Sequence, residues 1–315
     1  MTDKKTINFN QSHKKLIFGG FAIICLTPFV SAPLALLLGI IFVQIFTHPF
    51  PETSKKATNW LLKASVVGLG FGMNATSAIK AGKEGFLFTV ASIVGTLFLG
   101  FLLGKLFKVE KITSFLISGG TAICGGSAIA ALSPVIKAKQ NQISVALGVI
   151  FILNSVALFL YPFVGHLLHL SQTDFGLWCA IAIHDTSSVV GAASKYGDQA
   201  LAVATTVKLA RALWIIPVAF FSTLIFKNKD TKVKIPYFIG LFILAIVCNT
   251  FVPGINIFSP YIVAISKAGL TLTLFLIGTS LSSKLIKSVG INPILQGTVL
   301  WFTISVSALL SIIYI

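Results

Sequence analysis

Long apolar runs dominate this chain. Stretches of about 20 residues with few charges recur from residue 16 to residue 314, and that length crosses the hydrocarbon core of a bilayer as a helix. A transmembrane β-barrel would instead alternate apolar and polar residues. Hydrophobic residues make up 56% of the chain and charged residues 10%, against roughly 25% charged residues in soluble domains. A soluble enzyme, a disordered chain and a secreted disulfide scaffold are therefore excluded, and we predict an all-α polytopic membrane protein.

The apolar runs divide into eleven predicted spans with short connections. They cover residues 16–31, 32–47, 58–74, 85–104, 112–136, 141–165, 175–194, 200–226, 235–252, 259–281 and 291–314. No linker is long enough to separate two domains, so we expect one integral membrane domain over residues 1–315. Residues 1–15 are polar and basic without a small-residue cleavage site, which predicts a cytoplasmic tail and not a removed signal peptide.

The loop lysines test this topology, because cytoplasmic loops carry an excess of basic residues. With the N-terminus inside, fifteen loop lysines fall on the inner side and five on the outer side. The inner group is Lys4, Lys5, Lys14, Lys15, Lys55, Lys56, Lys105, Lys108, Lys111, Lys227, Lys229, Lys232, Lys234, Lys284 and Lys287. The outer group is Lys80, Lys83, Lys137, Lys139 and Lys195. The excess predicts an inner N-terminus and an outer C-terminus.

The net charge of +16 has the same explanation. It comes from 24 Lys and Arg residues against 8 acids, and Arg211 is the only arginine. A nucleic-acid surface uses more arginine than this, so we expect no nucleic-acid partner.

Enzyme and metal motifs are absent from the sequence. The four cysteines, Cys25, Cys124, Cys179 and Cys248, lie in apolar stretches without a CxxC pair or a histidine at ligand spacing. The spans offer no second deep acid for an aspartyl protease, no nucleophile elbow and no P-loop. We therefore predict that the protein is not an enzyme and holds no metal or other cofactor.

The fifth span is rich in glycine. Residues 118–127 read SGGTAICGGS, and four glycines cost a regular helix about 3–4 kcal/mol relative to alanine. Close helix packing through small residues is one interpretation. The other is a discontinuous helix whose freed amides and half-helix N-terminus bind an anion. That second interpretation predicts substrate contacts from Gly119, Gly120, Thr121, Gly125, Gly126 and Ser127.

The seventh span is interrupted by polar residues. It contains His184, Asp185, Thr186, Ser187 and Ser188 in succession. A regular helix would turn some of these side chains toward lipid, so we expect an unwound or re-entrant segment. His184 and Asp185 are candidate carriers of a coupled proton or ion, although a neutral His184 bonded within the bundle is an alternative. Ser187 and Ser188 are predicted substrate contacts.

Two cations lie deep in the eighth span. Lys208 and Arg211 are three residues apart and share a helix face, and each charge costs about 2.5–3.5 kcal/mol on insertion scales. Pairing with Asp185 explains Arg211 but leaves Lys208 without an acid. An anionic substrate would supply the missing negative charge, so both cations are predicted to bind it, with Asp185 holding Arg211 when the site is empty.

A loose internal similarity joins residues 67–80 to residues 274–287. Both segments carry an apolar, glycine-containing end followed by an Ile-Lys pair and another apolar run. Because spans three and ten run in opposite directions, the similarity predicts an inverted repeat, which is common in secondary transporters.

Three motifs in this order resemble the YeiH family of bacterial inner-membrane proteins. They are residues 119–131 (GGTAICGGSAIAA), residues 184–193 (HDTSSVVGAA) and residues 208–211 (KLAR). The family is commonly labelled as sulfate exporters, and the resemblance extends through nearly the whole chain. It implies a multi-pass bacterial inner-membrane transporter. The layout is also similar to that of inverted-repeat transporters of the bile-acid-symporter type, with a panel and a moving core.

Together these features predict a secondary transporter of a small anion, with sulfate or a sulfonate as the leading class. The expected partners are the lipid bilayer and the anion, and a homodimer is compatible with the sequence. One alternative is a Na⁺- or H⁺-coupled transporter of another solute, in which Asp185 and Asn154 bind the cation. Another is a membrane sensor or enzyme without transport.

Overall fold

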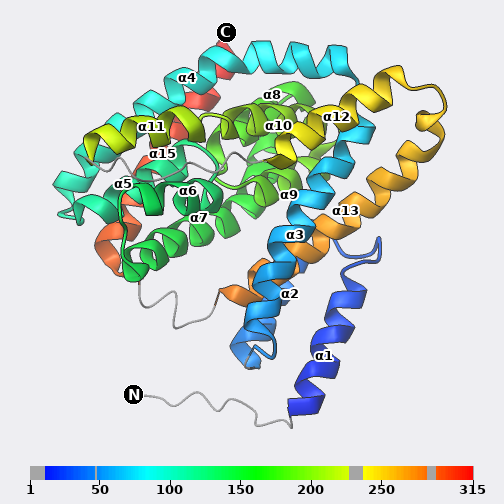
Figure 1. Cartoon of the computed structure of the whole chain (residues 1–315), viewed down its shortest axis with the longest axis horizontal. Coiled ribbons are helices and arrows are strands. Elements are labelled where there is room, and N and C mark those ends of the chain that lie inside the picture. Colours follow the sequence, from blue (N-terminus) through cyan, green and yellow to red (C-terminus); the bar gives the residue numbers. More distant parts are fainter. Residues whose placement is uncertain (1–10, 47, 227–236, 282–288, 315) are drawn as a thin grey trace. The chain divides into compact units, whose positions relative to one another are not determined.

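A computed structural model describes residues 11–46, 48–226, 237–281 and 289–314 (Figure 1), and this described part contains helices and no strand. The helices are α1 (Gln11–Ile24), α2 (Ala32–Ile45), α3 (Pro51–Leu69), η1 (Gly70–Gly72), α4 (Ala75–Leu106), α5 (Lys111–Ala122), α6 (Gly126–Val135), α7 (Gln140–Leu167), α8 (Gln172–Ala182), α9 (Thr186–Tyr196), α10 (Asp198–Ala212), α11 (Ile215–Ile225), α12 (Tyr237–Phe251), α13 (Ile255–Ser280) and α15 (Ile291–Tyr314). Each predicted span overlaps one helix or a consecutive pair, and α4 begins at Ala75, ten residues before the predicted span 85–104.

Five helical stretches of the described residues are long and apolar enough to cross a membrane. They are Thr89–Leu106, Asn141–Leu167, Asp198–Thr223, Ile255–Ser280 and Ile291–Tyr314. Shorter apolar helices include α2, α6 and α12. The predicted class, an all-α polytopic membrane protein, is confirmed.

The chain forms two compact units, and each unit combines two separate stretches of sequence. The first contains Met1–Gly72 and Leu241–Lys284, and the second contains Met73–Gly240 and Leu285–Ile315. No long linker in the sequence marks this division, and the boundary between Lys284 and Leu285 lies outside the described residues.

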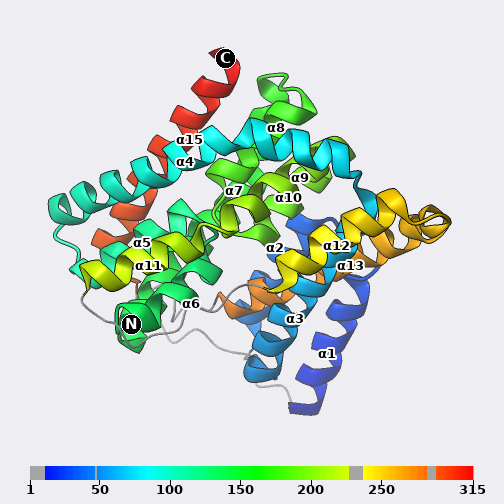
Figure 2. The same ribbon diagram turned by 45° about the horizontal axis from the view of Figure 1, so that its top comes forward.

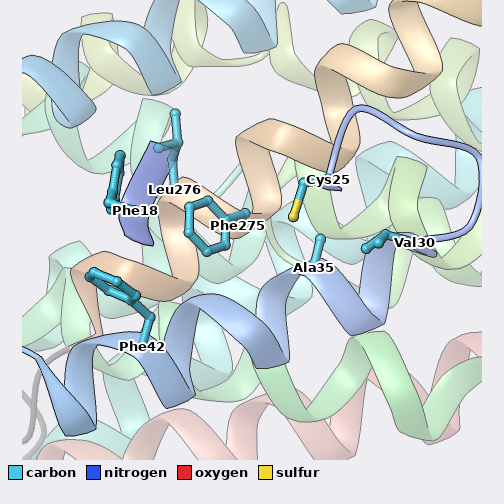
Figure 3. Close-up of a cluster of buried hydrophobic side chains, with 7 residues drawn as sticks. All are labelled: Phe18, Cys25, Val30, Ala35, Phe42, Phe275 and Leu276. Carbon is cyan, nitrogen blue, oxygen red and sulfur yellow. The ribbon is translucent and has the colours of Figure 1, made fainter. Parts of the chain in front are cut away.

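The first unit is built around α13, which packs along α2 and α3. Gly39 of α2 lies so close to α13 that a Cβ there would be 2.2 Å from the Phe275 carbonyl oxygen. Figure 3 shows the apolar cluster around Phe275, which joins α1, α2 and α13. Ser65 and Gly68 of α3 contact Gly269 and Ser266 of α13, so these helices run antiparallel. That direction agrees with an inverted repeat, which stays a prediction; residues 282–287 of the proposed repeat lie outside the described residues.

In the second unit, α5 and α6 form a re-entrant hairpin. A Cβ at Gly119 would meet Leu132 at 2.6 Å and one at Gly120 would meet Ile129 at 3.1 Å, so the two helices pack antiparallel. The hairpin's open end is held together by Gln142, whose side-chain amide donates to the Glu110 carboxylate and accepts from the Lys139 N–H. The chain therefore returns to the end at which α5 began. We call this segment hairpin 1.

A second hairpin, formed by α8 and α9, is arranged in the same way. The Phe175 and Tyr196 rings stack with their centroids 3.7 Å apart, and the Gln199 N–H donates to the Gln172 side-chain oxygen at 3.0 Å. The end of α9 thus lies beside the start of α8. We call this segment hairpin 2.

Hairpins 1 and 2 open at opposite ends of α7, which connects them (Figures 1 and 2). Gln142 near the start of α7 binds the open end of hairpin 1. Near the other end of α7, the Gly165 carbonyl accepts from the Tyr196 hydroxyl of hairpin 2. The four hairpin helices have 10–12 residues each, or about 15–18 Å, which is about half of a 30 Å hydrocarbon core.

The prediction that residues 112–136 cross the membrane is therefore wrong, whereas residues 175–194 follow the re-entrant alternative predicted for them. Each segment enters and returns, while α4, α7, the α10–α11 pair and α15 run the full length of the unit. Helix α1 begins at Gln11 and not at residue 16. Residues 1–10 of the predicted tail, and Lys227, Lys229, Lys232, Lys234, Lys284 and Lys287, lie outside the described residues.

Candidate functional site

The two hairpin tips meet beside the middle of α7. Gly125, at the tip of hairpin 1, has φ 61° and ψ −122°, a conformation that only glycine adopts easily. A Cβ at Gly125 would lie 3.2 Å from the Asp185 Cβ, at the tip of hairpin 2, and 3.2 Å from Ile150 of α7. Both predicted interruptions are present, since α5 ends at Ala122 and α8 ends at Ala182.

Side chains from α10 and α15 bind the carbonyl groups at the end of α8. Lys208 Nζ donates to the Ala180 and Ile183 carbonyls, at 3.3 and 2.6 Å. Arg211 Nη1 donates to the Ile181 carbonyl at 2.8 Å. Trp301 Nε1 of α15 donates to the Ala182 carbonyl at 3.1 Å. Four successive carbonyls are thus satisfied at a helix end, where the backbone leaves them without partners and the helix dipole favours cations.

Arg211 also reaches hairpin 1. Its Nε donates to the Ala122 carbonyl at the end of α5, at 2.6 Å. One guanidinium therefore connects the C-terminal ends of α5 and α8. Lys208 and Arg211 are both fully buried, with 0% exposure.

The predicted pairing of Arg211 with Asp185 is wrong. Asp185 instead caps α9, accepting from the Ser188 N–H at 2.7 Å and from the Ser187 hydroxyl at 2.6 Å. Its second oxygen accepts from the Ser188 hydroxyl and from the side-chain amide of Asn154 on α7. Asn154 also accepts from the His184 N–H at 3.0 Å. The carboxylate is held by its own hairpin and by α7, while the guanidinium is held by carbonyl groups.

Two glycines of the fifth span serve close helix packing, and the other two lie at a helix interruption. Gly119 and Gly120 lie within α5, where they allow close packing against α6 and α7. The prediction that they offer free amides to a substrate is therefore wrong, because helical N–H groups are already bonded. Gly125 and Gly126 do lie at the interruption. No side chain caps α6, and Ser127 in its first turn is exposed, so this helix start is accessible.

Several buried polar atoms near the tips have no hydrogen-bond partner among the described residues. They are both ring nitrogens of His184, the Thr121 and Thr205 hydroxyls and Arg211 Nη2. His184 and Thr121 are at most 2% exposed. The alternative in which the His184 ring is bonded within the bundle does not fit this geometry. Buried polar atoms of this kind call for water or a ligand.

Sequence reasoning missed the contribution of Trp301 and gave Asn154 only as a cation ligand. The signal for Trp301 was its position ten residues into an apolar span, away from the membrane interface where tryptophan is usually enriched. The interruption between α10 and α11 was also missed. Pro217 explains it, because proline offers no N–H to the Leu213 carbonyl and its ring clashes there.

The tips bring together a fixed charge pattern. Two cations and one carboxylate lie within the buried region, so its formal charge is +1. The cations face the negative ends of α5 and α8, and Asp185 faces the positive end of α9. At the start of α6 the N-cap residue, Gly125, offers no side chain, and the Cys124 sulfur accepts from the Ala128 N–H, so the Gly126 and Ser127 amides are the ones to which no side chain of the described residues is bonded.

Comparison with known proteins agrees with the predicted resemblance. A family model described as "Conserved hypothetical protein 698" matches residues 19–297. A "UPF0324 membrane protein" of Bacteroides thetaiotaomicron is 54% identical over 291 residues, which cover 92% of this chain and 88% of the relative. Another from Shewanella oneidensis is 49% identical over 300 residues, covering 95% of both chains. No solved structure matches. The chain belongs to the conserved hypothetical protein 698 family, that of the UPF0324 membrane proteins, as its resemblance to the YeiH family predicted.

Proposed function

We propose that this membrane protein is a secondary transporter of a small anion, with sulfate or a sulfonate as the leading class. The observation that carries the proposal is the meeting of two oppositely directed hairpin tips around Lys208 and Arg211, both with 0% exposure. Carbonyl groups hold the two cations in place, but carbonyl dipoles do not cancel their net charge. A bound anion would complete the charge balance at the tips.

The uncapped start of α6 is the proposed entry point for the anion. The Gly126 and Ser127 amides and the exposed Ser127 hydroxyl are donors, and the helix dipole favours negative charge there. Arg211 Nη2 and the His184 ring are spare polar groups deeper in the unit. We place Gly125, Gly126, Ser127, Lys208 and Arg211 in the anion site, with Thr121 beside it. Ser187 and Ser188 hold Asp185 instead of the substrate.

The hairpin arrangement also suits alternating access. Each hairpin fills half the depth from one end, so a short barrier at the tips separates the two sides. Small movements of the tips would open one side at a time. This mechanism needs no cofactor and no catalytic residue.

We propose an inner-membrane location in bacteria, with the N-terminus in the cytoplasm. Because hairpin 1 returns to its starting end, Lys137 and Lys139 join the inner lysines. The predicted excess then rises from fifteen against five to seventeen against three. Lys139→Cys should react with an impermeant thiol reagent from the cytoplasmic side alone, and Lys195→Cys from the opposite side alone. Reaction of both from one side would contradict this topology.

The transport test is uptake of radiolabelled sulfate or a sulfonate into proteoliposomes. Arg211→Gln should abolish uptake, whereas Lys195→Gln, at an exposed position away from the tips, should preserve it. Since Arg211→Gln also weakens the fold, the anion should in addition raise the melting temperature of the wild-type protein and not that of Gly126→Pro. Undiminished uptake in Arg211→Gln would remove the guanidinium from the mechanism. No uptake and no thermal shift with any anion would favour a sensor or an enzyme.

Coupling to Na⁺ or H⁺ is a second candidate, favoured by the cluster of Asp185, Asn154 and His184. Uptake driven by a Na⁺ or proton gradient, and lost in Asp185→Asn, would support it. If uptake depends on neither a Na⁺ gradient nor a proton gradient, Asp185 acts only as the cap of α9.

A further inference from the structure

The second unit contains a cavity at the interruption between α10 and α11, separate from the hairpin tips. Its volume is about 330 Å³, within the range of roughly 300–1,000 Å³ found for small-molecule sites. The lining comes from α4 and from α10–α11 and includes Phe86, Thr89, Val207, Ala210, Trp214 and Pro217.

Pro217 explains why space remains here. The helix cannot continue its bonding pattern at Leu213, and the chain makes a tighter turn, with the Leu213 and Trp214 N–H groups donating to the Ala210 and Arg211 carbonyls. The Phe86 and Trp214 rings, both in the lining, are tilted at 45° with their centroids 6.4 Å apart. Among the described lining residues Thr89 is the polar one and the rest are apolar, so these residues offer little to a polar guest.

The depth of the cavity identifies its occupant. Ala210 is adjacent to Arg211, whose guanidinium binds both hairpin tips at the middle of the unit. The α10–α11 pair starts beside the open end of hairpin 2, where the Ala200 N–H contacts Gln172. It ends beside hairpin 1, where the Phe226 and Phe115 rings are 5.1 Å apart. The cavity therefore lies midway between the two ends of the unit.

At that depth a membrane protein is surrounded by the hydrocarbon tails of lipids. The rim of the cavity is open and apolar, since Phe86 is 54% exposed and Leu213 is 43% exposed. We propose that the cavity binds the end of a lipid acyl chain, wedged between α4 and the α10–α11 interruption. The chain contacts the face of α10 that carries Val207 and Ala210, about 100° around the helix from Lys208 and Arg211. This inference does not depend on the anion-transport proposal.

Tryptophan quenching by brominated lipids tests the assignment. The purified protein is placed in phosphatidylcholine vesicles whose acyl chains carry bromine either near the terminal methyl group or near the headgroup. The fluorescence of Trp214 is obtained by subtracting the spectrum of Trp214→Phe from that of the wild type. We expect deep bromines to quench most of this component and shallow bromines to quench little. Trp60→Phe, which removes an exposed tryptophan of α3, is the matched control for the subtraction.

A cavity-filling variant separates a bound chain from ordinary lipid contact. Ala210→Leu places bulk in the cavity and should remove the deep quenching of Trp214, while the emission of the other tryptophans is unchanged. Two results overturn the proposal. If bromine at neither depth quenches Trp214 fluorescence, protein from this chain or from a second copy covers the cavity. Equal quenching in Ala210→Leu and the wild type means that no chain enters it.

Discussion

The two hairpin tips have the same outline but different chemistry. Hairpin 1 turns through Gly125, whose positive φ carries the chain round, and the helix that follows begins without a side-chain cap. Hairpin 2 turns through His184 and Asp185, and the Asp185 carboxylate caps the following helix. The start of α6 is accessible at Ser127, whereas residues 183–193 of hairpin 2 are all buried.

This difference suggests that hairpin 2 stabilises the fold and that hairpin 1 binds the anion. Hairpin 2 satisfies its own helix start with a carboxylate and its helix end with Lys208, Arg211 and Trp301. Hairpin 1 shares Arg211 at its helix end, and at its helix start the Gly126 and Ser127 amides have no carboxylate cap and are open to a ligand. We therefore expect damage to hairpin 2 to appear as lost stability, and damage to the tip of hairpin 1 to appear partly as lost binding.

Removal of the Asp185 carboxylate should have the largest effect. Asp185→Ala uncaps α9 and leaves the Asn154 amide and two serine hydroxyls without their acceptor. We expect a loss of about 3 kcal/mol in unfolding free energy, measured by denaturant unfolding in detergent. Asp185→Asn keeps one acceptor oxygen and should lose less. A loss below about 1 kcal/mol for the alanine variant would mean that the cap contributes as little as an exposed one.

The next largest effect distinguishes Arg211, which bonds carbonyl groups of both hairpins, from Lys208, which bonds carbonyl groups of hairpin 2. Arg211→Met should cost about 2–3 kcal/mol, because it leaves carbonyls unpaired in both hairpins. Hydrogen exchange should rise at the ends of both α5 and α8. Lys208→Met should raise exchange at the end of α8 alone. Faster exchange in α5 from the lysine variant would contradict the separation of roles.

The fate of Arg211 shows where sequence reasoning stops. The depth of the two cations and the positions of both interruptions follow from single residues in the sequence, and all were predicted. Pairing of Arg211 with Asp185 was expected because opposite charges at one depth attract. The structure instead offers four unpaired carbonyls at the end of α8, and a broken helix creates such acceptors whatever its side chains are. Their number and direction appear only when the chain has folded.

A re-entrant course was predicted as an alternative for the seventh span but not for the fifth. The predicted spans 112–136 and 175–194 are as long as membrane crossings, so length could not distinguish a broken crossing from a hairpin. The evidence lies in long-range pairs such as Glu110 with Gln142 and Phe175 with Tyr196. Apolar content predicts that a segment enters the membrane, but the side on which it leaves depends on such contacts.

A smaller effect is expected from a methyl group at the tip of hairpin 1. Gly125→Ala forces a side chain into a backbone conformation that costs roughly 1–3 kcal/mol, and its Cβ would also press against Asp185. We expect a loss of about 2 kcal/mol in thermal or denaturant unfolding. The neighbouring Gly126→Ala is the control. Its Cβ would meet Leu147 at an ordinary 3.5 Å in a regular helix, which should stabilise by up to about 1 kcal/mol. Equal losses at both positions would show that the turn does not depend on the positive φ of Gly125.

The smallest effect comes from the same substitution at the two tips. Ser187→Ala removes a buried hydroxyl that donates to Asp185 at 2.6 Å, and it should cost about 1 kcal/mol of stability. Ser127→Ala removes an exposed hydroxyl and should change stability by less than about 0.5 kcal/mol. Anion affinity, measured as the sulfate-dependent rise in melting temperature, should show the opposite order, because only Ser127 lies at the free start of α6. If Ser187→Ala reduces the sulfate-dependent rise in melting temperature more than Ser127→Ala does, the anion binds at hairpin 2. The roles proposed for the two hairpins are then reversed.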